Sequence, residues 1–188
     1  MEHIVEKKVY LPKYNNMIDI SLEFYPLQLS RGSDMVDDMI INQIIRELKE
    51  PIEKISKSEL PQKFIDGQSF FITNRLPISN YALFDLIDDN IYVDADVASN
   101  IRTISATFIL AHEIGHKIDK YTETSRVYQE LANIFNLSIN DQETLSETFA
   151  DICGNIVSGM NHYHELSENV SEDKNNYAKR LVLGSIYR

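Results

Sequence analysis

The sequence predicts an α+β domain in which a small sheet precedes a mainly helical half. Apolar and polar residues alternate strictly over Ile18–Phe24, a pattern typical of a half-buried strand. From about residue 100 onward, apolar residues recur at helical spacing and capping residues precede each run. A chain of 188 residues is most simply one domain, 1–188, and it is long enough to bury a core.

Strands and one helix are expected in the N-terminal half. Ser33 can cap a helix that runs to about Glu50, where Pro51 ends it. A second strand is expected over Ser69–Asn74. The runs YALFDLI and IYVDA flank the turn-forming residues Asp88–Asn90, so the sequence predicts a β-hairpin there.

The C-terminal half is expected to consist of helices. Each begins near a residue whose side chain can accept a hydrogen bond from the first turn, and the last one also carries acidic residues at its positive end. The expected bounds are Ser99 or Asn100 to Ile118, Ser125 to Asn136, Asn140 or Asp141 to about Ser158, and Ser171 to about Tyr187.

The run ILAHEIGHKID (Ile109–Asp119) places polar residues in an otherwise apolar stretch of helix. His112 and His116 are four residues apart and therefore project from one helix face. Two imidazoles in that position can bind one tetrahedral zinc ion. Glu113 is suitably placed to hold and deprotonate a water molecule at the metal. The alternative is a chance HExxH on an ordinary helix, with carboxylates satisfying the histidines.

A further ligand is available in LSETFADICGN (Leu145–Asn155), on a later helix. Glu147 can complete a set of three protein ligands and leave the fourth position to water. Asp151, one turn later, can accept a hydrogen bond from the outer ring nitrogen of a histidine. Alone, this pair would indicate a solvated acidic stripe. The upstream HEIGH favours the metal site.

The combination of HEIGH with ETFADICG resembles the gluzincin metallopeptidases, whose pattern is HExxH followed by Glu-x-x-x-Asp/Glu. HEIGHKIDKY and ETFAD also resemble the family of the anthrax lethal factor catalytic domain and the Pro-Pro endopeptidases. Regulatory peptidases of the ImmA/IrrE type have similar sequence motifs. The resemblance extends from Phe108 to Gly154. It implies a compact zincin-like metallopeptidase fold that binds one zinc ion per chain.

The resemblance also assigns roles to individual residues. It implies that the zinc ligands are His112, His116 and Glu147, that Glu113 is the general base, and that Asp151 supports a ligand histidine. One feature departs from the lethal-factor-like pattern. In that family a tyrosine shortly before the ligand glutamate is expected to stabilise the oxyanion, but the stretch before Glu147, NLSINDQETLS, contains no tyrosine.

Other residues can supply that missing donor. The segment NHYHE contains His162, Tyr163 and His164, and a tyrosine or protonated histidine there can donate to a developing oxyanion. The alternative is that these residues are exposed in a loop. Tyr121 and Tyr128 are the next candidates.

Two further expectations concern packing around the helices and the binding of substrate. Gly115 and Gly154 predict close approach of another element, since glycine in a helix costs about 1 kcal/mol relative to alanine. In zincins, the strand before the HExxH helix is an edge that binds the substrate backbone by strand addition. The resemblance therefore implies that Ile91–Ala95 is that edge.

Composition limits the partners and the compartment. The net charge of −11 and the pI near 4.8 disfavour binding to nucleic acid or to anionic membranes, so a protein or peptide substrate is expected. No apolar run is long enough for a transmembrane helix or a signal peptide, and Cys153 has no internal disulfide partner. A cytoplasmic location is expected. Oligomeric state is not indicated.

The function that these observations favour is that of a zinc-dependent endopeptidase, in which Glu113 moves the proton. One alternative is a regulatory zincin-fold protein that binds or cleaves one specific partner, such as a repressor. Another is a non-catalytic zinc-binding interaction domain. An intact Glu113 argues against a purely structural metal, because structural zinc sites have four protein ligands and need no base.

Overall fold

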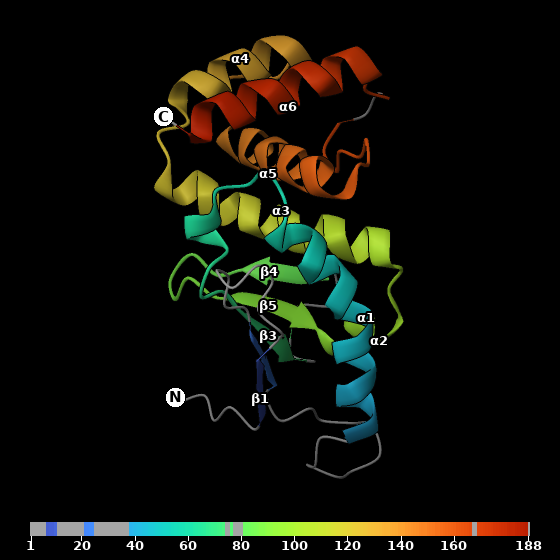
Figure 1. The fold of residues 1–188 in the computed structure, drawn as a ribbon. Helices are drawn as coiled ribbons and strands as arrows, with labels where there is room; N and C mark the ends of the chain where they lie inside the picture. The colour runs from blue at the N-terminus through green and yellow to red at the C-terminus, as the bar shows by residue number, and fades with distance from the viewer. Residues whose placement is uncertain are drawn as a thin grey trace.

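A five-stranded mixed sheet lies at one end of the molecule, and most of the helices stack above it (Figure 1). The computed structural model describes residues 7–10, 21–24, 38–73, 76, 81–166 and 169–187. The strands are β1 (Lys7–Tyr10), β2 (Ser21–Phe24), β3 (Ser69–Thr73), β4 (Ala82–Phe84) and β5 (Ile91–Asp94). Their order across the sheet is β1-β2-β3-β5-β4. The two inner pairings are parallel and the two outer ones antiparallel. The predicted α+β class is confirmed.

Most of the helices lie in successive layers above the sheet, whereas the first long helix runs alongside it (Figure 1). The helices are α1 (Asp38–Ser56), the 3₁₀ turn η1 (Gln62–Phe64), α2 (Ala95–Asn100), α3 (Thr103–Tyr121), α4 (Ser125–Phe135), α5 (Gln142–Ser158) and α6 (Glu172–Ile186). In Figure 1, α3 lies on the β4 side of the sheet, α5 lies over α3, and α4 and α6 are outermost. No helix in the described ranges is long and apolar enough to cross a bilayer.

The helix α1 continues through Pro51, whereas the sequence predicts that this residue ends it. A proline inside a helix removes a backbone hydrogen bond and costs about 3 kcal/mol. The apolar stripe continues past it, because Ile52 and Ile55 are fully buried. Burial of each isoleucine contributes about 1.5–3 kcal/mol, which offsets that cost. The predicted cap, Ser33, lies outside the described residues, as do residues 18–20 of the first predicted strand.

The helix that carries HEIGH begins later than predicted. A short helix, α2, precedes it, and the Asp94 carboxylate caps α2 by accepting from the Val97 amide at 3.0 Å. The cap of α3 is Arg102 rather than Ser99 or Asn100, because the chain is extended at Ile101 and Arg102. The later helices are confirmed near their predicted bounds, with side-chain caps from Asp141 and Ser171.

The predicted hairpin is confirmed, but the prediction that Ile91–Ala95 is a sheet edge is wrong. Within the hairpin, β4 pairs antiparallel with β5, with Leu83 opposite Tyr92. On its other side, β5 pairs in parallel with β3. Both sides of β5 are therefore bonded, and the first arm of the hairpin, β4, is the outer strand. Local sequence does not reveal this order, because it depends on the long-range pairing of β5 with β3.

Close packing of α3 against α5 positions the two halves of the candidate site. A Cβ atom on Gly115 would lie 2.8 Å from Ala150 Cα, and one on Gly154 would lie 2.8 Å from the Phe108 ring. Both glycines therefore permit a close contact between the two helices, as predicted. Cys153 is fully buried in this contact.

Candidate metal centre

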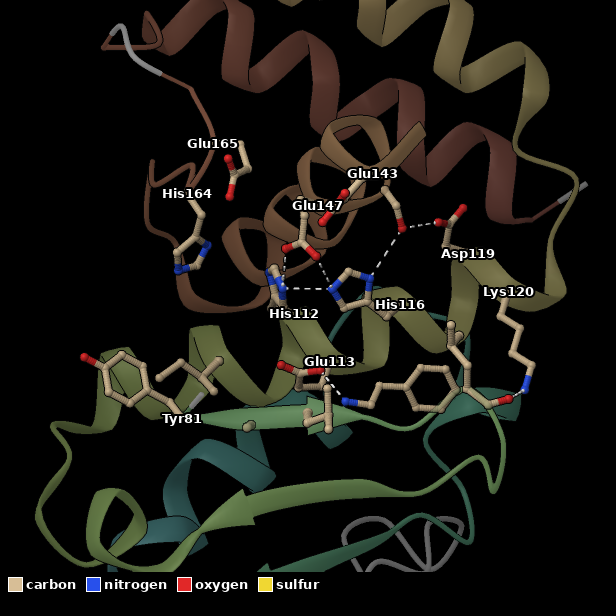
Figure 2. A pocket seen from close by; sticks show the side chains of 16 residues that line it. Tyr81, His112, Glu113, His116, Asp119, Lys120, Glu143, Glu147, His164 and Glu165 are labelled. Carbon is tan, nitrogen blue, oxygen red and sulfur yellow. Dashed lines mark hydrogen bonds and ion pairs between the residues drawn. The ribbon is translucent and has the colours of Figure 1, made fainter. Parts of the chain in front are cut away.

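Three side chains whose nitrogen or oxygen atoms could hold a metal ion converge where α3 faces α5 (Figure 2). His112 and His116 project from one face of α3, and their Nε2 atoms are 3.0 Å apart. From α5, the carboxylate of Glu147 places Oε2 3.4 Å from His112 Nε2 and Oε1 3.4 Å from His116 Nε2. The structure thus brings together the three residues predicted to be ligands.

Asp151 determines which nitrogen of His112 faces this cluster. Its Oδ1 atom lies 2.9 Å from His112 Nδ1, and a carboxylate oxygen only accepts, so Nδ1 carries the proton. In the neutral ring, the lone pair is then on Nε2, the atom that faces His116 and Glu147. Asp151 is 1% exposed, so its orientation is fixed by the surrounding packing. This is the supporting contact predicted for Asp151.

A second series of side-chain contacts, through Ser146 and Asp119, orients His116 as Asp151 orients His112. The Nδ1 atom of His116 lies 3.5 Å from the Ser146 hydroxyl, which donates to Asp119 Oδ2 at 2.7 Å. The same carboxylate oxygen accepts from the Tyr128 hydroxyl. Because the Ser146 proton is given to Asp119, its oxygen is free to accept from His116 Nδ1. The Nε2 lone pair of His116 then faces the cluster as well.

The spacing of these three residues fits a single zinc ion. Tetrahedral coordination at about 2.0–2.1 Å places ligand atoms about 3.3–3.4 Å apart. The separations of 3.0, 3.4 and 3.4 Å are close to that value. In these neutral tautomers all three facing atoms are acceptors, whereas a protonated His112 donates from Nε2 to Glu147. The chemistry of the donor set therefore favours a cation between them.

Electrostatics at the cluster also favour positive charge. Burial disfavours the charged form of His112, but hydrogen bonds with Asp151 and Glu147 outweigh it and raise its pKa to about 10. Hydrogen bonds with His112 and His116 hold the pKa of Glu147 well below its ordinary value. Bound metal must displace protons from such ligands, so the binding affinity is expected to depend on pH.

Glu113 lies beside the cluster but points toward the sheet. The residue is 7% exposed, and its Oε2 atom accepts from the backbone amide of Phe84 on β4 at 2.6 Å. Figure 2 shows this bond between α3 and the outer strand. Burial raises the pKa of the Glu113 carboxyl, a direction that suits a group exchanging protons near neutral pH.

The cluster and Glu113 open into a cleft of about 620 Å³ between β4 and α5. The cleft combines apolar side chains with several carboxylates. Its lining consists of Tyr81, Ala82, Leu83, Phe84, Leu86, Ile109, His112, Glu113, His116, Asp119, Lys120, Glu143, Ser146, Glu147, His164 and Glu165. A cleft of this size is within the range of small-molecule and peptide-binding sites.

Of the three residues predicted to donate to an oxyanion, only His164 lines this cleft. Its Nδ1 atom lies 2.7 Å from Asp151 Oδ1, and its backbone amide donates to Asp151 Oδ2. The prediction for Tyr163 is wrong, because its buried hydroxyl donates to Asn175 on α6 at 2.8 Å. His162 is also outside the cleft, where its ring packs edge-on against Phe108.

The two further candidates for the oxyanion donor, Tyr121 and Tyr128, already have hydrogen-bond partners. The hydroxyl of Tyr121 donates to Asp89 in the β4–β5 turn, and that of Tyr128 donates to Asp119. Neither tyrosine lines the cleft. Among the described residues, no tyrosine other than Tyr81 lines it, and that side chain is 59% exposed.

Sequence reasoning missed three contributors to the site. Asp119 lies three residues after His116, within one turn of the same helix, so its place near His116 could have been predicted from this spacing. Ser146 directly precedes Glu147, but a serine in a helix has many possible partners. The backbone amide of Phe84 had no sequence signal, because any residue except proline supplies the same group.

Comparisons of the chain with protein-family models, curated protein sequences and solved structures found no match. The interpretation of the site therefore depends on the geometry of its own residues.

Proposed function

We propose that the protein is a zinc-dependent endopeptidase with a zincin-like site. The observation that carries this proposal is the set of three acceptors from His112, His116 and Glu147, facing a cleft that also holds a buried Glu113. Three protein ligands with an accessible fourth position are typical of catalytic rather than structural zinc. Two histidines and one glutamate form one of the known catalytic ligand sets.

When bound, zinc supplies Lewis acidity and lowers the pKa of water at its open position. Glu113 is the residue of the chain that moves the proton. Its carboxylate takes a proton from the attacking water and returns it to the nitrogen of the departing amine. The bond from the Phe84 amide holds one carboxylate oxygen, Oε2, toward β4. The other carboxylate oxygen of Glu113, Oε1, is the one that takes up the proton.

His164 is the proposed donor to the oxyanion. Asp151 accepts from its Nδ1 atom, so Nε2 donates in the cleft only when the ring is protonated, and this hydrogen bond raises the pKa of His164 toward that form. The same carboxylate oxygen binds His112, and the two rings are 5.3 Å apart between centroids. One buried aspartate thus orients both a metal ligand and a donor beside it. Removing such a donor lowers kcat by about 10²–10³-fold.

The outer strand β4 is the proposed track for the substrate backbone. Its side away from β5 lies along the cleft, beside Glu113. An exposed sheet edge can bind an extended peptide by adding it as another strand. Ile91–Ala95 cannot take this role, because β5 is paired with a strand on each side.

The proposal is tested by incubating the zinc-loaded protein with a denatured proteome and mapping newly formed N-termini. We expect new N-termini to appear within the proteome polypeptides when zinc is present. They should be absent when the protein has been treated with a chelator. If the loaded protein generates no new N-termini above the chelated control, the proposed activity is wrong.

A further inference from the structure

The strand β4 directs alternate backbone groups toward opposite sides. The amide of Asp85 donates to the Asn90 carbonyl, and that of Asp94 donates to the Tyr81 carbonyl. These bonds, with Leu83 opposite Tyr92, show that residues 81, 83 and 85 direct their backbone groups toward β5. In an antiparallel pair, the intervening residues point the other way. The backbone groups of Ala82 and Phe84 therefore face outward from the hairpin, toward α3 and the cleft that both residues line.

These two outward-facing residues differ in their partners. The Phe84 amide donates to Glu113 Oε2 at 2.6 Å, so it already has a buried charged acceptor. For the amide and carbonyl of Ala82, no described residue provides a bond. A peptide that joins β4 can therefore pair with Ala82 without breaking the contact that holds Glu113.

The charge of the cleft indicates which peptides this edge suits. Five carboxylates line the described walls, those of Glu113, Asp119, Glu143, Glu147 and Glu165, whereas Lys120 is the one lining lysine. A divalent metal ion and this lysine would together offset three of the five negative charges. The cleft would remain anionic, which favours a cationic ligand.

Two of the carboxylates are available to such a ligand. Glu143 is one turn before the ligand Glu147 on α5, and Glu165 follows His164. Both are exposed, and neither has a bonding partner among the described residues. In Figure 2 they lie on the opposite side of the cleft from β4. By contrast, Lys120 is already paired with Asp89 and the Leu86 carbonyl.

We infer that the edge of β4 divides its outward amides between two tasks. The Phe84 amide holds Glu113, and the backbone of Ala82 docks an extended, positively charged peptide whose basic side chains face Glu143 and Glu165. This inference rests on the proposed function. The peptide carbonyl that would pair with Phe84 in a continuous ladder receives no hydrogen bond from β4. The ladder is therefore interrupted beside Glu113, where the reaction is proposed to occur.

Docking is tested on the metal-free protein, where no turnover complicates binding. The probes are an eight-residue peptide that alternates lysine with threonine and its counterpart with glutamate at every lysine position. The lysine peptide should bind at least about 10-fold more tightly at low salt, and this preference should decrease as salt rises. In backbone NMR, the lysine peptide should slow exchange of the Ala82 amide and leave that of Phe84 unchanged.

Two variants separate the backbone contact from the charge contact. Ala82→Pro removes the outward amide, and proline is tolerated on the outer side of an edge strand. It should weaken binding of the lysine peptide about 10-fold, whereas Ala82→Ser, which keeps the amide, should not. The double variant Glu143→Gln/Glu165→Gln should abolish the preference for the lysine peptide. Circular dichroism and an unchanged zinc affinity confirm that each variant is folded.

Equal binding of both peptides, or protection of Phe84 instead of Ala82, would overturn this inference. Tight binding of the lysine peptide by Ala82→Pro would also overturn it. Each of these results concerns docking to the metal-free protein. Failure of the proposed peptidase activity would instead appear as an absence of new N-termini from the zinc-loaded protein, so the two failures are distinguishable.

Discussion

Glu147 and Glu143 lie one turn apart on α5, but only Glu147 lies within 3.4 Å of the two histidines. Glu147→Gln replaces an anionic ligand by a neutral amide, so zinc affinity should fall by at least about 100-fold. Glu143→Gln removes the same charge from the same helix and should leave zinc affinity within a factor of a few. Isothermal titration with zinc measures both. Equal affinities in the two variants would remove Glu147 from the ligand set.

Asp151 and Ser146 act on zinc through the histidines that they orient. Asp151→Asn keeps one oxygen for the two imidazole N–H groups but removes the negative charge and places an NH2 group where Oδ2 accepts from the His164 amide. Ser146→Ala leaves His116 Nδ1 without its hydroxyl partner. Each change should lower zinc affinity about 10- to 100-fold. Ser158→Ala, at the far end of the same helix, is the control. Affinities equal to the control would show that these contacts do not tune the metal site.

At the residue scale, sequence was most informative where helical spacing alone places side chains. His112 with His116, and Glu147 with Asp151, are each one turn apart, so each pair had to share a face. Tyr163 was assigned wrongly because its direction depends on a loop and on Asn175 in α6. No local pattern encodes that partner.

At the scale of elements, the contact between α3 and α5 sets the separation of the ligands. Gly115→Ala would place Cβ 2.8 Å from the Ala150 Cα atom, which belongs to the backbone and cannot move independently. Such overpacking should lower the free energy of unfolding by about 1–3 kcal/mol. Zinc affinity should fall too, because α5 must shift away from the histidines. Chemical denaturation and zinc titration measure the two effects.

Gly184 in α6 provides the matched control, because a Cβ atom there meets nothing within 4 Å. Gly184→Ala should raise the free energy of unfolding by up to about 1 kcal/mol through helix propensity alone. A stabilising effect of Gly115→Ala similar to that of Gly184→Ala would contradict the close packing described for α3 and α5.

Several helices could be predicted from sequence because their caps and periodicity are local. Asp141 and Ser171 accept hydrogen bonds from Thr144 and Lys174, as the capping patterns predicted. Pro51 was misleading because its local cost is outweighed by burial of Ile52 and Ile55 against the rest of the fold. The edge position of β4 depended on strand order, which is a long-range property.

At the scale of the whole molecule, zinc would connect helices that are distant in sequence. His112 and His116 belong to α3, and Glu147 belongs to α5, so an ion bound by all three can bind only the folded chain. At free zinc 100 times the Kd, this linkage should contribute about 2.7 kcal/mol. For a domain of this size, the Tm should rise by about 5–10 °C. Scanning calorimetry with and without zinc measures the shift.

The variant Glu147→Gln controls this experiment because its zinc affinity should be low. Its Tm should change little at the same zinc concentration. An equal rise in the variant and the native chain would mean that zinc binds elsewhere.

The α+β class was predictable because the two halves differ in their hydrophobic period. The position of the cleft was not, because it is formed by β4 and α5, which are about sixty residues apart in the sequence and both pack against α3. The acidic character of the chain was visible in composition, but the gathering of carboxylates along one cleft follows from the fold.

The role proposed for Glu113 is to move a proton in a metal-dependent reaction without binding the metal. Its most direct test compares the peptidase rate of the native protein with that of Glu113→Gln, each with its measured zinc content. The variant should hold the same zinc per chain and lose about 10²–10⁴-fold in kcat. Equal zinc with an unchanged kcat, or loss of zinc from the variant, would contradict the account.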